Sequence, residues 1–413
     1  MKIQGKNINI LEINYCDLIG RIFNGYDLQK SLNEKGNYTV SQIVKDKLSN
    51  NPHVYAIGND YILQEQMKHI ERSFSISNLL STCGLRLYEM EAYKKADIIH
   101  YHILHNDFIS LLDLPLLMKD KQSVWTIHDP WIVTGNCVYP LQCNCWKTGC
   151  GNCTHLDYKW FEMHEDNTQG MWELKKEILS QVNPTIVVAS EFMRNYIEKS
   201  PLTEHFTNIV KIPFGVKMKP NQIRARSEMK KRFSLLDGDF VIGFRSEEGE
   251  IKGCNFLYMA LRHIEQKEHV SLMVVGSGKI PDYLKETYKV VELGWVNDES
   301  IMEQFFASCD VFVMPSLAES FGLMAIEAMA AEVPVVCFQG TVVEELIHAP
   351  DCGIAVEYKS VEGLKQSLEY LIENREVAEQ KGKAGKERVD QQYTYEQYVD
   401  CHVQLYERLY EEK

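Results

Sequence analysis

The chain alternates short runs of β-branched and aliphatic residues with longer segments in which apolar residues recur at helical spacing. This alternation predicts parallel β-strands joined by helical crossovers. The expected strands cover residues 8–13, 98–101, 123–127 and 185–188 in the first half, and 240–244, 271–275, 311–314 and 335–338 in the second. The pattern therefore predicts an α/β protein with two doubly wound units.

The length of 413 residues exceeds what one hydrophobic core usually serves, so we expect two domains. The first is expected over residues 1–216, because residues 217–232 are rich in Lys and Arg, contain Pro220 and are typical of a linker leading into a surface helix. The second is expected over residues 217–390. Residues 391–413 carry aromatic and aliphatic side chains at helical spacing, which predicts a terminal amphipathic helix.

The composition, with 45% hydrophobic and 25% charged residues, is typical of a soluble globular protein. A formal net charge of −14 argues against a general nucleic-acid binder, which requires a basic surface. The first residues contain no apolar signal segment and no stretch approaches the length of a membrane span, so we expect a cytoplasmic location. The twelve cysteines are then expected to be thiols or metal ligands rather than disulfides.

Two carboxylates, Glu319 and Glu327, lie eight positions apart around a helix start expected at residues 320–322. The helix is apolar all round and is expected to be buried, with Glu327 as the charge in its middle. A buried carboxylate needs partners, which a ribose diol supplies, and the free amides at the helix start can receive phosphate. The alternative is a capped core helix whose Glu327 meets an Arg or Lys.

The sequence Glu-Ser-Phe-Gly-Leu, followed by Glu-Ala-Met-Ala, resembles the signature of retaining glycosyltransferases of family 4 (GT4). The resemblance implies the GT-B fold, in which two Rossmann-like domains face a cleft and a C-terminal helix returns to the first domain. It also implies a nucleotide-sugar donor whose sugar is held by Glu319 and whose ribose is held by Glu327. The residues of the turn between them are implied to line the nucleotide site: Ser320, Phe321, Gly322 and Leu323.

Two cations, Arg245 and Lys252, follow the strand expected at residues 240–244. Ligands of open parallel sheets bind beyond the carboxyl ends of the strands, where both cations would neutralise a diphosphate. The pair resembles the Arg and Lys-Gly that contact donor phosphates in the family, whereas the alternative pairs them with the glutamates between them. By the same resemblance, Gly294 and Val296 are expected to contact the nucleotide base.

In the first domain, Gly20 lies in a segment that resembles the glycine-rich loop near the donor diphosphate, with plain turn chemistry as the alternative. His128 follows the strand expected at residues 123–127, and a His at this motif contacts the transferred sugar in related transferases. The resemblance therefore assigns His128 to the catalytic site. His100 and His102 share one face of the preceding strand and are expected to line the cleft or to be structural, with a metal pair as the alternative.

Five cysteines fall within 17 residues, over residues 137–153. A Cys-x2-Cys step brings two thiolates to one ion, and four thiolates complete a tetrahedral zinc shell. The segment resembles an insertion in a subset of bacterial polysaccharide transferases, and on that match the structural zinc ligands are Cys137, Cys143, Cys150 and Cys153, with Cys145 spare. Free thiols, an iron–sulfur cluster and disulfides formed by oxidation are the alternatives.

Together these features predict a retaining transferase that moves a hexose from a nucleoside-diphosphate sugar to a glycan or lipid-linked acceptor in cell-surface polysaccharide assembly. UDP is the expected nucleotide and GDP the alternative. We expect no redox cofactor, no nucleic-acid partner, and peripheral contact with the inner face of the cell membrane. No catalytic base is assigned, and the resemblance implies front-face displacement. The alternatives are another GT-B enzyme, such as a nucleotide-sugar epimerase or a sugar phosphorylase, and a zinc-stabilised binding or scaffold protein with a degenerate transferase site.

Overall fold

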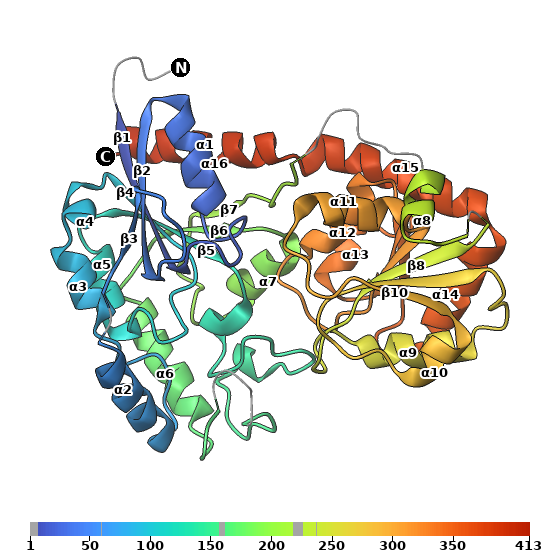
Figure 1. Ribbon diagram of the computed structural model, residues 1–413. Helices are drawn as coiled ribbons and strands as arrows, with labels where there is room; N and C mark the ends of the chain where they lie inside the picture. The colour runs from blue at the N-terminus through green and yellow to red at the C-terminus, as the bar shows by residue number, and fades with distance from the viewer. Residues whose placement is uncertain (1–6, 59, 157–161, 218–225, 237) are drawn as a thin grey trace. The chain divides into compact units, whose positions relative to one another are not determined.

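The computed structural model describes residues 7–58, 60–156, 162–217, 226–236 and 238–413, and the chain divides into two compact units (Figure 1). Unit 1 comprises Met1–Phe214 and Tyr398–Lys413, and unit 2 comprises Gly215–Gln397. The divisions expected from the sequence, after residues 216 and 390, lie two and seven positions from these bounds. Each unit contains one parallel sheet.

The sheet of unit 1 has the strand order β3-β2-β1-β4-β5-β6-β7. Its strands are β1 (Ile8–Cys16), β2 (Tyr38–Asp46), β3 (Val54–Ala56), β4 (Ile98–Tyr101), β5 (Gln122–Ile127), β6 (Thr185–Val188) and β7 (Ile209–Lys211). The order reverses at β1, which pairs in parallel with β2 on one side and β4 on the other. In this register Glu12 lies beside both Gln42 and His100. Such a switch point is where open α/β sheets bind ligands.

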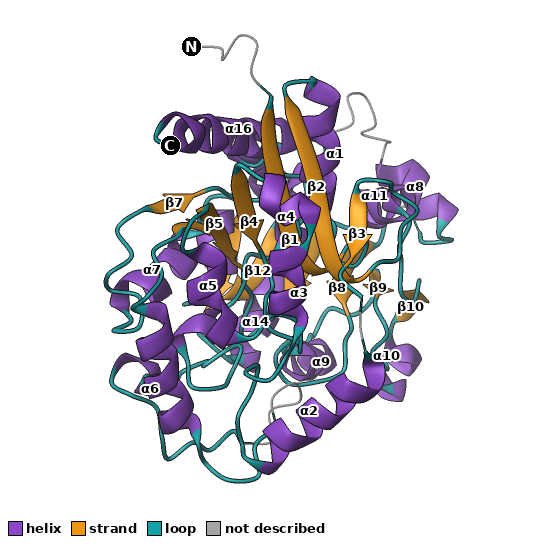
Figure 2. Cartoon of the chain, turned by 90° about the vertical axis from the view of Figure 1, so that its left-hand side faces the viewer, coloured by secondary structure: helices purple, strands orange, loops and turns teal. Residues whose placement is uncertain are grey.

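The helices of unit 1 include one that comes from the far end of the chain (Figure 2). They are α1 (Tyr26–Lys35), α2 (Tyr61–Ser73), α3 (Cys83–Glu89), α4 (Glu91–Lys95), α5 (Leu114–Met118), α6 (Thr168–Leu179), α7 (Glu191–Lys199) and, at the C-terminus, α16 (Tyr395–Glu411). The Tyr38 hydroxyl on β2 donates to Glu407 on α16 at 3.0 Å, and Lys413 pairs with Asp97 at 3.2 Å. These contacts join the terminal helix to unit 1.

The sheet of unit 2 has the strand order β10-β9-β8-β11-β12-β13. Its strands are β8 (Phe240–Arg245), β9 (Val270–Val275), β10 (Lys289–Glu292), β11 (Val311–Met314), β12 (Val335–Phe338) and β13 (Gly353–Val356). The helices are α8 (Arg226–Arg232), α9 (Cys254–His263), α10 (Asp282–Thr287), α11 (Glu299–Ser308), α12 (Leu323–Ala330), α13 (Val342–Ile347), α14 (Val361–Glu373) and α15 (Arg375–Gln392). Here the order reverses at β8, which places the ends of β8 and β11 side by side.

The prediction of two doubly wound α/β units is confirmed, because each unit holds a parallel sheet with helical crossovers. The sequence did not predict five strands, β2, β3, β7, β10 and β13. Of the linker expected at residues 217–232, the part from 218 to 225, including Pro220, lies outside the described residues. Over the described ranges, the helices are too short or too polar to cross a membrane.

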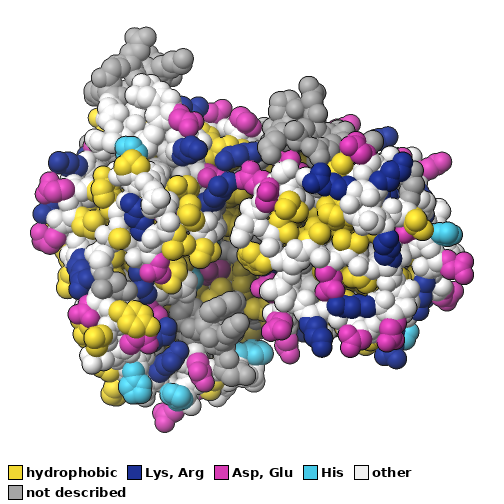
Figure 3. Space-filling model, in the orientation of Figure 1, with side chains coloured by type: hydrophobic (Ala, Val, Ile, Leu, Met, Phe, Trp, Pro, Cys, Tyr) yellow, Lys and Arg dark blue, Asp and Glu magenta, His cyan; other side chains and the backbone are white. Residues whose placement is uncertain are grey.

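The surface carries both signs of charge. On the face in Figure 3, Asp and Glu side chains are interspersed with Lys and Arg. Apolar side chains also reach the surface of α2, where Tyr61 and Ile62 are each 72% exposed, and Phe74 directly after the helix is 69% exposed.

Candidate functional site

The carboxyl edge of the unit 2 sheet brings together a lysine and a glutamate that the sequence had singled out. Lys252 lies on the loop between β8 and α9, and Glu319 on the loop between β11 and α12. The Lys252 Nζ atom donates to Glu319 Oε1 at 2.6 Å, and the Ser316 hydroxyl donates to the same oxygen at 2.9 Å. Both charged side chains are largely buried, so the pair forms a preorganised polar centre.

The loop that carries Lys252 is held in place by backbone contacts. Gly253 adopts a φ of 64°, and a Cβ there would collide with the carbonyl oxygen of Pro315. The Leu317 amide donates to the Ile251 carbonyl at 2.7 Å. Only glycine permits this close approach at positive φ. The two loops after β8 and β11 therefore fix the lysine next to the glutamate.

Arg245, the last residue of β8, has a different partner. Its Nη2 atom lies 2.6 Å from Glu247 Oε2, and its guanidinium lies over the Trp295 ring at 5.1 Å. The alternative pairing with intervening glutamates thus holds for Arg245, whereas Lys252 pairs with Glu319. Gly294 precedes Trp295 in an exposed turn, and the half-buried Val296 follows it. The arginine and the segment expected at the nucleotide base therefore lie together.

Helix α12 begins at Leu323, directly after the segment where the sequence predicts a start. Gly322 has a φ of 97°, and Phe321 is buried with its ring edge on Tyr393. Ser320 is half-buried. A helix start is where backbone amides can bind an anion, and here the Ala325 amide already donates to the Gly322 carbonyl at 2.9 Å.

Glu327 projects from the middle of α12 and is half-buried. Within the described parts of the chain, the structure records no hydrogen bond or ion pair for its carboxylate. Burial, with a smaller effect from the negative charge of Glu299, raises the pKa of Glu327 to about 7. The alternative in which Glu327 meets an Arg or Lys is therefore not found among the described residues. Within the described residues, the carboxylate therefore lacks the partners that burial requires.

In unit 1, the loop after β1 is organised by two polar side chains that the sequence did not single out. The Asn24 amide donates to the carbonyl oxygens of Cys16, Asp17 and Ile19, at 2.5 to 3.0 Å. The buried Asp17 carboxylate accepts from the amides of residues 48 and 49. Gly20 lies at an exposed turn with a φ of 68°. The loop is thus a rigid turn in the described structure.

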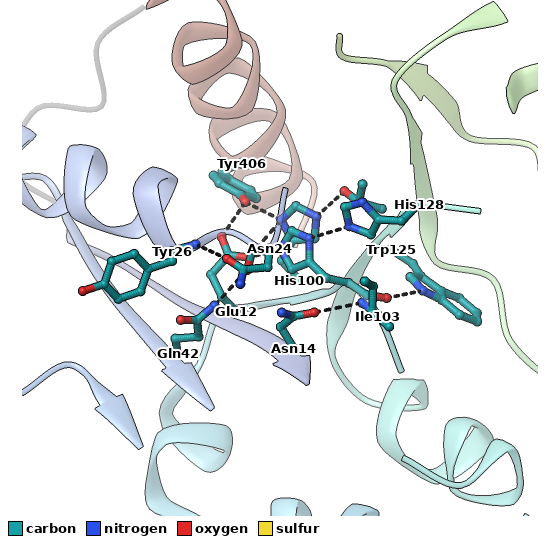
Figure 4. Close-up of polar contacts among 12 residues, drawn as sticks. Glu12, Asn14, Asn24, Tyr26, Gln42, His100, Ile103, Trp125, His128 and Tyr406 are labelled. Atoms are coloured by element: carbon teal, nitrogen blue, oxygen red, sulfur yellow. Dashed lines mark hydrogen bonds and ion pairs between the residues drawn. The ribbon is translucent and has the colours of Figure 1, made fainter. Parts of the chain in front are cut away.

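His128, at the end of β5, belongs to a buried polar network (Figure 4). Its Nε2 atom lies 3.1 Å from His102 Nδ1, and His102 Nε2 lies 2.6 Å from Glu12 Oε2. Glu12 and His102 are 0% and 2% exposed, whereas His128 is half-buried. The strand-end histidine is therefore linked through a second histidine to a buried carboxylate.

A second branch of the network reaches the terminal helix. His100 Nδ1 lies 2.6 Å from the Tyr406 hydroxyl and Nε2 lies 2.7 Å from the Thr126 hydroxyl. Tyr406 also donates to Glu12 Oε1 at 3.1 Å. The sequence missed Glu12 and Tyr406. The available signal was a glutamate inside the apolar strand β1, because such a charge must have buried partners.

The metal alternative for the histidine pair can be tested on geometry. Over the ranges that the structure describes, three or more potential ligand atoms come within 4.8 Å of one another at Glu12, His100 and His102. Two ligands at about 2.0–2.1 Å from a tetrahedral zinc lie about 3.3 Å apart. The separation of 2.6 Å between Glu12 Oε2 and His102 Nε2 is a hydrogen-bond distance, and both nitrogens of His100 are already engaged. These residues fit a hydrogen-bonded network rather than a metal centre.

The cysteine loop contacts helix α6 of unit 1, where the Gly151 amide donates to the Thr168 hydroxyl at 3.0 Å. Its Cys150 Sγ atom accepts from the Gly135 amide at 3.2 Å, and burial raises the pKa of Cys137 to about 12. Beneath it, the buried Lys175 ammonium donates to the carbonyls of Trp131 and Thr134 at 2.7 and 2.9 Å. In the described chain, no three of the cysteine sulfurs come within 4.8 Å of one another. The five sulfurs share one loop without forming a closed tetrahedral shell.

Residues 240–374 match the family described as Glycosyl transferases group 1. An uncharacterized glycosyltransferase of Methanocaldococcus jannaschii is 30% identical over 184 residues, which is 43% of this chain and 47% of that protein. The capsular polysaccharide biosynthesis glycosyltransferase CapM of Staphylococcus aureus is 27% identical over 222 residues, which is 51% of this chain and 57% of that protein. The chain thus spans about half the length of these curated relatives.

Solved structures match over nearly the whole chain. Sucrose-phosphate synthase from Thermosynechococcus elongatus has a TM-score of 0.69 at 18% identity, covering 99% of this chain and 100% of that one. Anabaena HepE in complex with UDP-glucose has a TM-score of 0.65 at 15% identity, covering 96% and 98%. The fold is therefore that of GT-B glycosyltransferases, and residues 240–374 are similar to the group 1 glycosyltransferase family.

Proposed function

We propose that this chain, which has the GT-B fold, is a retaining glycosyltransferase that moves a hexose from a nucleoside-diphosphate sugar to an acceptor. The observation that carries the proposal is the grouping of Arg245, Lys252 and Glu319 at one edge of the unit 2 sheet, with Glu327 on α12, for which no partner is recorded among the described residues. Two cations suit a diphosphate, and two carboxylates suit the hydroxyls of ribose and hexose.

In this proposal each group has one task in binding the donor. Glu327 accepts hydrogen bonds from the ribose hydroxyls, which supplies the partners that its burial requires. The amides at the start of α12, at residues 320–323, and the backbone at Gly20 receive the diphosphate. Gly294 and Val296 contact the base. UDP is proposed as the nucleotide because a protein of similar fold is described in complex with UDP-glucose; GDP is the alternative.

Transfer then proceeds on the face of the sugar from which the phosphate leaves. The bond from the anomeric carbon to the phosphate oxygen breaks, the bond to the acceptor oxygen forms, and the departing phosphate takes the acceptor proton. Arg245 and Lys252 stabilise the negative charge that grows on the phosphate. Glu319 holds the sugar hydroxyls while it orients Lys252, and His128 contacts the same sugar. No protein side chain is needed as a base.

The acceptor is proposed to be a glycan or a lipid-linked sugar of cell-surface polysaccharide assembly. The support is the similarity to CapM, which is named for capsular polysaccharide biosynthesis. We place this activity in the cytoplasm, at the inner face of the cell membrane. The apolar side chains exposed on and after α2, Tyr61, Ile62 and Phe74, would contact the membrane surface. Co-sedimentation with anionic vesicles, lost on substitution of Ile62 and Phe74 by serine, tests this contact.

A structural zinc in the cysteine loop is a separate part of the proposal. Cys137, Cys143, Cys150 and Cys153 would hold the ion, and Cys145 would stay free. The donor set suits zinc, and the Gly135 amide supplies the type of N–H···S contact that stabilises a thiolate. With four protein ligands, the ion would stabilise the loop after His128 and take no part in transfer.

The experiment that tests the proposed function is a thermal-shift screen of the whole chain with UDP, GDP and ADP, followed by product analysis. A nucleotide at a hundred times its dissociation constant should add about 2.7 kcal/mol to stability. We expect one nucleotide to raise the melting temperature, and its sugar to yield a product of retained anomeric configuration when an acceptor is present. If none of the three raised it, a scaffold role would replace the enzyme proposal. Conversion of the donor sugar into its epimer in the absence of an acceptor would indicate a nucleotide-sugar epimerase.

A further inference from the structure

The orientation of His128 is determined by two residues to which the proposed function gives no task. Glu12 on β1 and His102 after β4 join His128 in a chain of hydrogen bonds at 2.6 and 3.1 Å. Figure 4 shows Glu12 and His128, the two ends of this chain, with Tyr406 of α16 next to Glu12. Because Glu12 and His102 are buried, the positions of their protons are determined by the hydrogen bond between them rather than by contact with water.

The positions of the protons follow from the donors and acceptors. Although burial acts to raise it, contacts with His100 and His102 hold the pKa of Glu12 well below its usual value, so the carboxylate is ionised and can only accept. The proton between Glu12 and His102 therefore sits on His102 Nε2. Burial, assisted by His100, lowers the pKa of His102 to about 4, so its second nitrogen, Nδ1, carries no proton at neutral pH. A bare Nδ1 can only accept, which requires the proton of the next contact to sit on His128 Nε2.

We propose that Glu12 and His102 are positioning residues that hold His128 as the Nε2–H tautomer, so that Nδ1 of His128 is a bare acceptor for a hydroxyl of the donor sugar. The tautomer rests on the hydrogen-bond geometry together with the ionised state of Glu12 and the neutral state of His102, and the sugar contact rests on the proposed function. Within the described residues, the structure records no hydrogen bond for His128 Nδ1. That nitrogen is therefore the free end of a relay that starts at a buried carboxylate.

The packing around this chain of hydrogen bonds also fixes the orientation of the His128 ring. The Phe214 ring stacks on His128 at 5.8 Å with an interplanar angle of 16°, and Phe23 meets it edge-on at 6.5 Å. A Cβ on Gly25 would lie 2.6 Å from Glu12 Oε2 and 2.8 Å from His102 Nε2. The glycine therefore leaves the space that the carboxylate and imidazole occupy.

The bare acceptor has a consequence for the donor. Burial, with the nearby His102, His100 and His105, lowers the pKa of His128 well below its usual value, so the ring is neutral. A neutral acceptor binds a hydroxyl but gains nothing from a carboxylate, which has no proton to donate. The relay thus favours a neutral hexose with a free hydroxyl at the contact position. It disfavours donors in which a carboxylate replaces this hydroxyl, as in a uronic acid, or in which the hydroxyl is missing, as in a deoxy sugar.

The tautomer is tested on the free protein, without donor or acceptor. The whole chain is labelled with 15N-histidine, and two-bond proton–nitrogen correlation spectra at neutral pH identify which ring nitrogens carry protons. The His128 and His102 signals are assigned by their loss in His128→Asn and His102→Asn. We expect both rings in the Nε2–H form. An Nδ1–H form or an imidazolium at either ring overturns the proposal. The wild-type spectrum decides the outcome, so the test remains valid even if one of the assignment variants fails to fold.

Two variants then distinguish a positioning role of Glu12 from a general loss of packing around the buried network. In Glu12→Gln the amide can donate as well as accept, so His128 is expected to show both tautomers. Tyr406→Phe, the matched control, removes a buried hydroxyl from Glu12 but leaves both bonds of the relay, and the His128 spectrum should stay unchanged. Equal spectral changes in both variants, or none in Glu12→Gln, would refute the positioning role.

A kinetic readout tests the sugar contact. Glu12→Gln should lower kcat/KM for the hexose donor about tenfold and leave that for the matching deoxy sugar unchanged, because the deoxy sugar has no hydroxyl to lose. An equal loss on both sugars would overturn the contact. If the wild type bound no donor at all while its spectrum matched the expectation, the proposed function and the contact would fail and the tautomer assignment would stand.

Discussion

Replacing Glu327 by glutamine is expected to stabilise unit 2 at alkaline pH while weakening its affinity for nucleotide. The carboxylate is half-buried in α12, and its pKa is raised from the usual 4.5 to about 7. Between these values the unfolded chain loses the proton and the folded chain keeps it, so the free energy of unfolding falls as the pH rises. Glutamine does not titrate, and the variant escapes this loss.

The magnitude follows from the two pKa values. The two pKa values differ by about 2.5, and at about 1.36 kcal/mol for each unit the destabilisation above pH 7 is at most about 3.4 kcal/mol. Below about pH 4.5 the carboxyl is protonated in both states and the wild type and the variant should be equally stable. A nucleotide whose ribose hydroxyls satisfy the carboxylate should restore part of the loss in the wild type only.

The assay is urea unfolding, followed by circular dichroism, from about pH 5 to about pH 8. Because Glu327 lies in unit 2, the unfolding transition that differs between wild type and Glu327→Gln is assigned to unit 2. Glu376→Gln, which removes an exposed glutamate of α15, serves as the matched control and should follow the wild type. A Glu327→Gln variant with the wild-type pH profile, or one less stable than wild type at pH 8, would refute the reasoning.

Three further outcomes are expected. Lys252→Ala should lower kcat by about 10² to 10³, because a preorganised cation acts mainly on the charge of the transition state; lost donor affinity with unchanged kcat would point to simple anchoring. Gly25→Ala should cost about 1–3 kcal/mol of stability in thermal unfolding, because its Cβ would meet Glu12 Oε2 at 2.6 Å and its φ is 80°; wild-type stability would contradict that contact. Metal analysis should find one zinc per chain that is lost in Cys150→Ser and kept in Cys145→Ser, and zinc-free protein purified under reducing conditions would remove the metal proposal.

The parts of the fold that the sequence predicts are those whose residue pattern has one interpretation. Strands such as β11 and β12 are runs of Val, Phe, Met and Cys that are buried along their whole length, as in a parallel sheet. The sequence misses β10 and β13, where Lys289 and Gly353 interrupt the pattern and several residues are not buried. These two strands form the two edges of the sheet. There, pairing with the neighbouring strand determines the extended conformation more than the local residue pattern does.

The candidate site divides in the same way. Glu319, Glu327 and Lys252 are identified by short motifs, because each motif lies on one loop or helix start. The pairing of Lys252 with Glu319 needs two loops that only the sheet brings together. Glu12 and Tyr406 are 394 positions apart, and no local pattern connects a glutamate on β1 to a tyrosine on the last helix.

The measurement that tests the central claim most directly is a calorimetric titration of the nucleoside diphosphate selected by the thermal-shift screen into wild type, Glu327→Gln and Glu376→Gln at pH 8. A charge-assisted hydrogen bond to ribose contributes about 1.5–3 kcal/mol, which corresponds to a factor of about 10 to 150 in affinity. We predict one site per chain in the wild type, binding weaker by at least about tenfold in Glu327→Gln, and wild-type affinity in Glu376→Gln. Equal affinity in all three proteins, or no saturable binding to the wild type, would contradict the assignment of this site to a nucleotide-sugar donor.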